Sequence, residues 1–160
     1  MVLGSRKVMV NSARHKIIGF TLLELLITLA VISVLAAISI TSYSQYTIRA
    51  NRTDAKIALT RLAQQEERYF TTHRNYLYGQ DALDKLGVVD GKSEDKLYKL
   101  AVEKLGSKGY LLKATAIEGE SQFVRDESCR EFSLDHTGKE SAKDSSGKSD
   151  VGVIAECWGH

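Results

Sequence analysis

The stretch KIIGFTLLELLITLAVISVLAAISI, residues 16–40, decides the architecture of the chain. The part from Phe20 to Ile40 has 21 residues, and Glu24 is its only charged residue. Because a helix rises ~1.5 Å per residue, a helix of this length spans about 30 Å, the thickness of the hydrocarbon core of a bilayer. The sequence therefore predicts a helix over 20–40 that crosses a membrane.

The carboxylate of Glu24 needs a compensating partner, because an acid within a spanning helix costs roughly 2.5–3.5 kcal/mol. A secretory signal peptide has a shorter apolar core, and a plain membrane anchor leaves Glu24 unexplained. If the chain is cut between Gly19 and Phe20, the new amine of Phe20 lies one helical turn from Glu24. The two charges then offset each other, within one chain or between staggered neighbours. The basic residues before the cut would stay on the cytoplasmic side: Arg6, Lys7, Arg14 and Lys16.

The motif G-F-T-L-L-E at residues 19–24, followed by the long apolar run, resembles the N-terminus of the type IV pilin family. The resemblance implies cleavage by a prepilin peptidase after Gly19 and N-methylation of Phe20 by the same enzyme. It also implies that Glu24 guides docking into a helical filament. Residues 1–19 are then a basic leader peptide that is removed, and either Met1 or Met9 is its start.

No glycine or proline occurs between Phe20 and Tyr78, so one continuous helix from about residue 20 to residue 70 is expected. Beyond residue 40 this helix becomes amphipathic. Its core-facing stripe follows alternating spacings of four and three, with one acid as an interruption: Ala55, Leu59, Leu62, Glu66 and Tyr69. The basic residues of this half are expected on the solvated side: Arg49, Arg52, Lys56 and Arg61.

A second set of residues resembles minor pilins of the PilE-like branch. The pattern R-x-D-A-x-x-A-L leads to Q-x-E-R-Y-F and then to a tyrosine after a short polar loop. The residues that carry it are Arg52, Asp54, Ala55, Ala58, Leu59, Gln65, Glu67, Arg68, Tyr69, Phe70 and Tyr76. The C-terminal order of cysteine, apolar strand, D-x-x-G-K turn and final C-W also resembles this branch.

The remaining chain predicts an α+β domain, in which a long helix packs on three or four antiparallel strands. Residues 71–108 are a polar connection, and SEDKLYKLAVEKLG within it fits a short helix, or a strand in its second half. Strands are expected at GYLLKATAI, SQFVRD, CREFSLD and VGVIAECW, the first with Tyr110, Leu112, Ala114 and Ala116 on one face. The expected segments are 1–19 (leader), 20–40 (membrane or filament-core helix), 41–72 (amphipathic half) and 73–160 (globular region).

Cys129 and Cys157 are the only cysteines, and an even number in an exported chain favours one disulfide. The bond would close a loop with 27 residues between the cysteines and stabilise the domain by roughly 3–4 kcal/mol. A zinc site built from these cysteines with His136 and His160 lacks C-x-x-C spacing. We expect no catalytic residues, metal or cofactor, and hence no enzyme.

The pattern predicts a structural function: a minor pilin that enters or primes a type IV pilus. Its expected partners are other pilins, the prepilin peptidase, the assembly platform of the inner membrane and, before assembly, lipid. It would cross the inner membrane once, with its C-terminal domain in the periplasm, and then reach the pilus surface. The alternatives are a major pilin of the same fibre and a pseudopilin of a type II secretion system.

A DNA-uptake receptor is an alternative of a different class. It needs an exposed basic stripe with aromatic residues. The candidates are Lys92, Lys96, Lys99, Lys104 and Lys108, with Tyr98 and Tyr110. The acids Glu94, Asp95 and Glu103 are interleaved with them, which favours a mixed solvated surface. Without residues 1–19, which hold four basic residues and no acid, the formal net charge falls from +2 to −2, so there is no general electrostatic attraction to nucleic acid.

Overall fold

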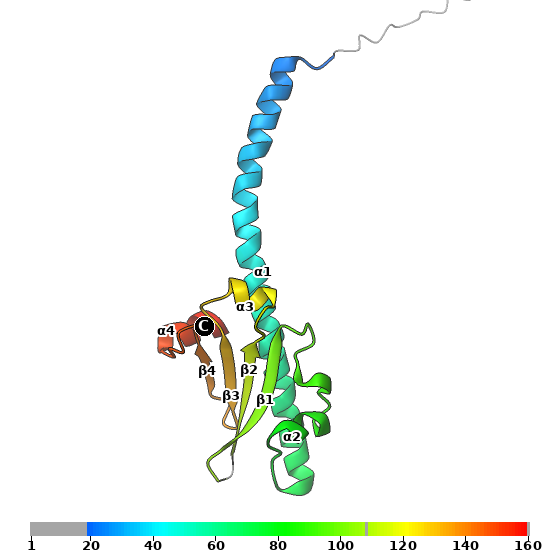
Figure 1. The fold of residues 1–160 in the computed structure, drawn as a ribbon, viewed down its shortest axis with the longest axis vertical. Helices are drawn as coiled ribbons and strands as arrows, with labels where there is room; N and C mark the ends of the chain where they lie inside the picture. The colour runs from blue at the N-terminus through cyan, green and yellow to red at the C-terminus, as the bar shows by residue number, and fades with distance from the viewer. Residues whose placement is uncertain (1–18, 108, 160) are drawn as a thin grey trace, which may run out of the picture. The chain divides into compact units, whose positions relative to one another are not determined.

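The computed structural model describes residues 19–107 and 109–159, so the expected leader lies almost entirely outside the described residues. The chain divides into two compact units, one ending at Ile40 and the other covering 41–160. Helix α1, Leu22–His73, contributes to both (Figure 1). The predicted long helix is therefore confirmed.

The N-terminal part of α1 begins at a cap on Thr21, whose Oγ1 accepts a hydrogen bond of 3.1 Å from the backbone N–H of Glu24. An 18-residue window of α1 has a mean hydropathy of 2.5, and none of it is buried. The hydroxyl of Ser33 in this segment donates to the carbonyl of Leu29 at 2.7 Å, so it carries no unsatisfied donor into an apolar environment. Length and composition make this part of α1 a candidate membrane span.

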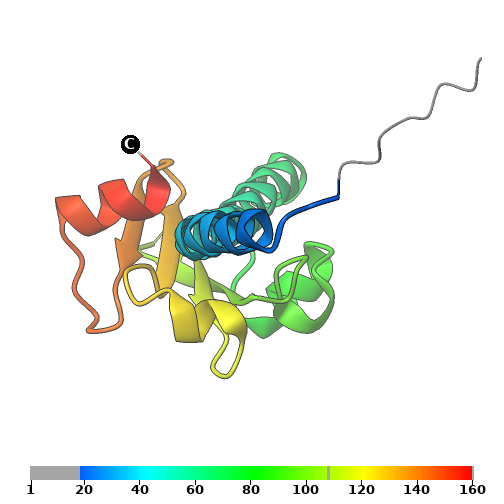
Figure 2. The same cartoon turned by 90° about the horizontal axis from the view of Figure 1, so that it is seen from above.

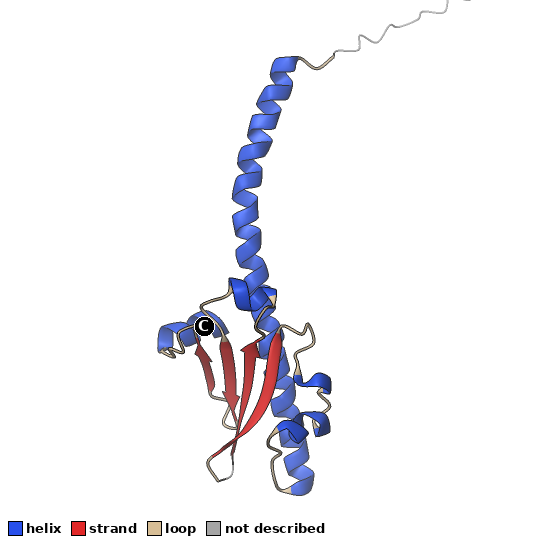
Figure 3. Ribbon diagram, viewed as in Figure 1, coloured by secondary structure: helices blue, strands red, loops and turns tan. Residues whose placement is uncertain are grey.

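The second unit contains one antiparallel sheet with the strand order β1-β2-β3-β4 (Figure 3). The strands are β1 Tyr98–Leu105, β2 Gly109–Ala116, β3 Glu131–Asp135 and β4 Glu140–Lys143. The other helices are α2 Gln80–Lys85, the 3₁₀ turn η1 Val89–Gly91, α3 Ser121–Arg125 and α4 Val151–Trp158. Helix α4 lies beside β4, and the segment with α2 lies at the β1 edge, as the view from above shows (Figure 2). The predicted α+β architecture is confirmed.

The core lies between the second half of α1 and one face of the sheet. The predicted stripe is confirmed, because Ala55, Leu59 and Leu62 are almost fully buried. The alternation predicted for β2 is confirmed as well: Tyr110, Leu112, Ala114 and Ala116 are all buried. Facing them from the neighbouring strands are Leu100, Val102 and Phe132.

Two of the predicted strands are wrong, because SQFVRD and VGVIAECW form helices α3 and α4. Helix α4 is capped at both ends. The carboxylate of Asp150 accepts from the N–H of Val153 at 2.9 Å, and Gly159 ends the helix with a left-handed conformation (φ 85°). The apolar run between these caps fits either periodicity, so the flanking Asp and Gly were the informative signals. The sequence left a helix and a strand open for SEDKLYKLAVEKLG. In the structure its second half, Tyr98–Leu105, forms strand β1.

Candidate functional site

The residues of the N-terminal motif lie at the start of α1. Phe20 is 78% exposed, and Gly19 has open space around its Cα. Thr21 and Glu24 have the T-x-x-E spacing of a capping box, of which the Thr21 half is formed. Glu24 is therefore also a first-turn acid at the positive end of the helix dipole, a role that the prediction of a docking charge did not include.

A turn with three exposed lysines projects from the β1 edge of the sheet. We call residues 92–99 the lysine turn. Lys92 and Lys99 are antiparallel bridge partners, so their side chains leave the backbone side by side, and Lys96 lies between them. Within residues 19–107 and 109–159, no carboxylate forms an ion pair with any of the three. Like charges directly opposite each other repel, so an anion between them would stabilise the turn.

The backbone of the lysine turn is held tightly. Ser93 and Tyr98 exchange bonds: the Ser93 N–H donates to the Tyr98 carbonyl at 2.9 Å, and the Tyr98 N–H donates to Ser93 Oγ at 3.0 Å. Lys96 adopts the left-handed conformation (φ 59°), which is strained for a residue other than glycine. The turn thus presents its lysines from a fixed backbone.

A hollow of about 520 Å³ lies between α1 and the segment from Leu86 to Lys96. Its floor is apolar, with Leu62, Leu86 and Leu100, and Lys92 and Lys96 reach its edge. Arg61 lines the same hollow, but it forms an exposed ion pair of 2.6 Å with Glu94. The interleaved acid Glu94 is therefore paired to α1 and does not neutralise the three lysines.

The predicted aromatic members of a DNA-binding stripe are wrong. Tyr98 and Tyr110 are buried in the core, and burial raises the pKa of both phenols. Lys99 and Lys104 are exposed, whereas Lys108 lies outside the described residues. Lys104 is placed over the ring of Tyr78, with 5.7 Å from Nζ to the ring centroid. The exposed surface near the lysine turn therefore offers cations, and its two predicted rings are not available for stacking.

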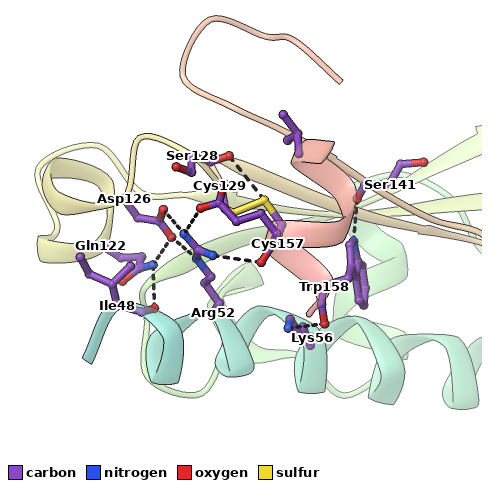
Figure 4. The surroundings of a disulfide bond; sticks show 12 residues. Ile48, Arg52, Lys56, Gln122, Asp126, Ser128, Cys129, Ser141, Cys157 and Trp158 are labelled. Carbon is purple, nitrogen blue, oxygen red and sulfur yellow. Dashed lines mark hydrogen bonds and ion pairs between the residues drawn. A yellow bond between two sulfur atoms is a disulfide. The ribbon is translucent and has the colours of Figure 1, made fainter. Parts of the chain in front are cut away.

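A buried ion pair joins α1 to the segment after α3 (Figure 4). The guanidinium of Arg52 binds both carboxylate oxygens of Asp126, at 2.7 and 2.8 Å. Gln122 donates to Asp126 at 2.7 Å and to the backbone carbonyl of Ile48 at 3.3 Å. Burial by itself lowers the pKa of Arg52. The hydrogen bonds that Arg52 makes with Asp126 and Glu156, and the negative charges of these two residues, outweigh burial and raise the pKa. Arg52 is only 7% exposed, so its predicted solvated position is wrong.

The same face of α1 holds the C-terminal end of α4. Arg52 Nη1 donates to the carbonyl of Glu156 at 3.2 Å. Lys56 Nζ donates to the carbonyl of Trp158 at 2.8 Å (Figure 4). Cations at the C-terminus of a helix satisfy its free carbonyls and oppose its dipole. The disulfide between Cys129 and Cys157, confirmed by the structure, ties α4 to the chain just before β3.

A second polar cluster lies at the C-terminal end of α1. Glu66 is fully buried, and its carboxylate accepts from the N–H of Leu77 at 3.1 Å. Burial raises the pKa of Glu66, the Leu77 bond opposes this effect, and the neighbouring Glu67 charge adds to it. Glu67 accepts from the hydroxyls of Tyr76, at 3.1 Å, and Tyr110, at 3.2 Å. Together these bonds position the chain where it leaves α1.

Sequence reasoning missed Arg52 as a buried residue, although a signal was present. Ile48 and Arg52 continue the spacing of the apolar stripe toward the N-terminus, and both are buried. Its partner Asp126 is 74 residues away, which no local pattern indicates. In the described part of the chain, no group of three or more His, Cys, Asp and Glu side chains is placed to hold a metal ion.

Two family models match the chain. Residues 41–133 match the family described as the type IV minor pilin ComP, DNA uptake sequence receptor. Residues 14–40 match the prokaryotic N-terminal methylation motif. The first match contains the lysine turn and both residues of the Arg52–Asp126 pair. The second contains Gly19, Phe20 and Glu24.

Proposed function

The chain belongs to the family of the type IV minor pilin ComP, the DNA uptake sequence receptor, and we propose that it carries a DNA-binding surface on a type IV pilus. The resemblance to type IV minor pilins is confirmed, and the family is one of structural pilins. Its description favours the DNA-receptor alternative, which the interleaved acids had made the weaker hypothesis.

The lysine turn is the observation that supports DNA binding most directly. Lys92 and Lys99 lie side by side, Lys96 belongs to the turn that joins them, and Glu94 pairs with Arg61. A phosphate between the lysines would replace their mutual repulsion by attraction and release counterions. Because Tyr98 and Tyr110 are buried, the proposed contact at this turn is to the phosphate backbone and not by stacking.

Changing Lys92, Lys96 and Lys99 together to glutamine should weaken duplex binding about tenfold or more at low salt, because three phosphate contacts are lost. The slope of log affinity against log salt should fall by ~0.9 for each lysine that contacts a phosphate. The measurement is fluorescence anisotropy of a labelled duplex, titrated with the full chain in detergent over a series of salt concentrations.

The matched control replaces three lysines that already have carboxylate partners. Lys113, Lys143 and Lys148 pair with Glu103, Glu131 and Asp150. Their conversion to glutamine removes the same total charge and should change the affinity much less. Equal losses in the two triple variants would mean that net charge, and not the lysine turn, governs binding.

We further propose that the N-terminal half of α1 packs in the filament core. Its large apolar side chains, such as Leu26 and Ile32, are more than half exposed in the single chain and require lipid or neighbouring helices to cover them. The proposal includes cleavage by a prepilin peptidase after Gly19, methylation of the Phe20 amine and a periplasmic domain before assembly. Delivery to the filament would use the inner-membrane platform. Abundance in sheared pili separates this function from that of a major pilin or a pseudopilin.

Changing Glu24 to glutamine should leave the membrane level normal and lower incorporation into pili about tenfold or more, because the amine of Phe20 loses its counter-charge in an apolar core. Glutamine retains the capping-box residue type, so the change isolates the charge. The measurements are quantitative immunoblots of membranes and sheared pili, with intact mass of the pilus protein. The expected mass is that of a singly methylated chain beginning at Phe20.

The control for this experiment is Thr21→Ala, which removes the cap of α1 and keeps the carboxylate. We expect this variant to enter pili at nearly the parental level. A Glu24→Gln chain found in pili in parental amounts would contradict the docking role, and a pilus protein beginning at Met1 would contradict the processing.

A further inference from the structure

A hollow of about 540 Å³ lies where α1 ends and the β1–β2 turn begins. It is separate from the lysine turn and shares no lining residue with the hollow of about 520 Å³ beside that turn. Its lining consists of three half-buried aromatic rings and three exposed polar residues: Phe70, Tyr76, Tyr78, Arg74, Asn75 and Ser107.

Two of the three rings of the aromatic wall, Phe70 and Tyr76, are held by contacts of their own. Phe70 and Tyr76 stack with their ring centroids 4.6 Å apart, and Tyr110 meets Tyr76 edge to face at 4.9 Å. The hydroxyl of Tyr76 donates a hydrogen bond of 3.1 Å to the carboxylate of Glu67, and this bond restrains the orientation of the ring. A wall that is already ordered loses little freedom when a flat ligand stacks on it.

Two cationic side chains, Lys104 and Arg74, lie beside this wall. Lys104 lies over the Tyr78 ring at 5.7 Å, and Arg74 lines the hollow with an exposed side chain that forms no ion pair within the described ranges. Arg74 also adopts the left-handed conformation (φ 56°) at the end of α1, a position that glycine usually occupies at a helix C-terminus. Arg74 therefore has a strained backbone at a position where glycine would end the helix without strain. Such backbone strain is typical of functional positions.

We propose that this hollow binds one unpaired nucleotide of the DNA, with its base stacked on Tyr78 and its phosphate beside Arg74 and Lys104. The proposal rests on the proposed DNA-receptor function and adds a second contact to it. Aromatic rings stack with any base, the cations favour an anionic ligand over a neutral sugar, and the Asn75 amide offers a donor and an acceptor to a base edge. Lys99 and Lys104 are five residues apart on β1, about 17 Å along this edge strand, and their side chains leave it on opposite faces, so the two contacts would be made by different parts of one DNA.

The test compares a blunt duplex with the same duplex carrying a short single-stranded oligothymidine tail. Both are titrated by fluorescence anisotropy with the full chain in detergent. We expect the parent to bind the tailed duplex about tenfold more tightly, which is within the range that stacking of one base contributes. Tyr78→Ala should abolish this preference without changing binding to the blunt duplex, and Tyr78→Phe, which keeps the ring, should preserve it.

Arg74→Gly separates a binding role from a structural one. The change relieves the strained backbone, so the melting temperature should stay equal or rise, and the preference for the tailed duplex should fall severalfold. A variant that loses stability together with the preference would assign Arg74 a structural role and overturn its assignment to the nucleotide.

The remaining outcomes distinguish the two proposals. If the parent binds both duplexes equally, the nucleotide site is wrong, and the lysine turn is then judged by its own triple variant. If Tyr78→Ala weakens both duplexes to the same extent, the site is also wrong. Displacement of the tailed duplex by a neutral monosaccharide as effectively as by thymidine monophosphate would assign the hollow to carbohydrate. If the parent binds neither duplex, both proposals fail.

Discussion

Replacement of Asp126 by alanine should lower the free energy of unfolding of the domain by about 3–5 kcal/mol, because it leaves the guanidinium of Arg52 buried without its counter-charge. Both carboxylate oxygens of Asp126 bind Arg52. The side chain of Arg52 is 9% exposed and that of Asp126 is 2% exposed. Gln122 loses its 2.7 Å acceptor in the same step. The measurement is chemical denaturation of the full chain in detergent, followed by tryptophan fluorescence of Trp158, the only tryptophan.

The chain contains its own control for this experiment. Arg61 and Glu94 form a pair of the same chemistry at 2.6 Å, but their side chains are 65% and 72% exposed. Glu94→Ala should therefore change the unfolding free energy by about 1 kcal/mol or less. The double variant Arg52→Met, Asp126→Leu should recover most of the loss, since an apolar pair of similar volume removes the uncompensated charge. Equal effects of Asp126→Ala and Glu94→Ala would contradict the buried pair.

Replacement of both cysteines by alanine should destabilise the domain by about 3–4 kcal/mol, because the unfolded chain regains the freedom of the loop between Cys129 and Cys157. The bond is placed where α4 meets the start of β3. We therefore expect hydrogen exchange to accelerate first at the amides of α4, which is also held by the bonds from Arg52, Lys56 and Trp158 and by packing on β4.

The lysine turn provides the internal reference for the disulfide variant. It is held by Ser93 and Tyr98 at the opposite edge of the sheet, so its amides should keep their protection relative to global unfolding. The parent protein treated with a reductant should show the same loss of stability as the double variant. An unchanged denaturation midpoint after complete reduction would show that the disulfide does not stabilise the native domain.

Combining Asp126→Ala with the double cysteine variant tests whether the ion pair and the disulfide stabilise α4 independently. Arg52 contacts Asp126 on one side and the Glu156 carbonyl on the other, so the ion pair and the helix end share one guanidinium. Because the sites are coupled through this group, we expect the combined variant to differ from the sum of the two single effects. The Arg52 cluster is therefore a mechanical link between α1, α3 and α4, and it is separate from the proposed DNA contacts.

Local sequence patterns predicted the features that depend on contacts between residues close together in the chain. The apolar run predicted a helix suited to a membrane, because a lipid-covered helix must be apolar over its whole length, and the G-F-T-L-L-E motif carried the resemblance to pilins. The four-three spacing of Ala55, Leu59 and Leu62 identified the core face of α1, and the alternation in β2 identified the inner face of the sheet. These periods arise from backbone geometry alone.

Only the tertiary structure decided the features that join distant segments. By its period the apolar run VGVIAECW fits a strand or a helix. The flanking Asp150 and Gly159 favour the helix α4 locally, and the tertiary structure adds the cations of α1 that bind its C-terminal carbonyls. The same holds for charge and aromatic residues: Arg52 is buried because Asp126, 74 residues away, compensates it. Tyr98 and Tyr110 are buried whereas Tyr78 lines a hollow, because the packing of α1 on the sheet, and not residue type, determines which rings water can reach.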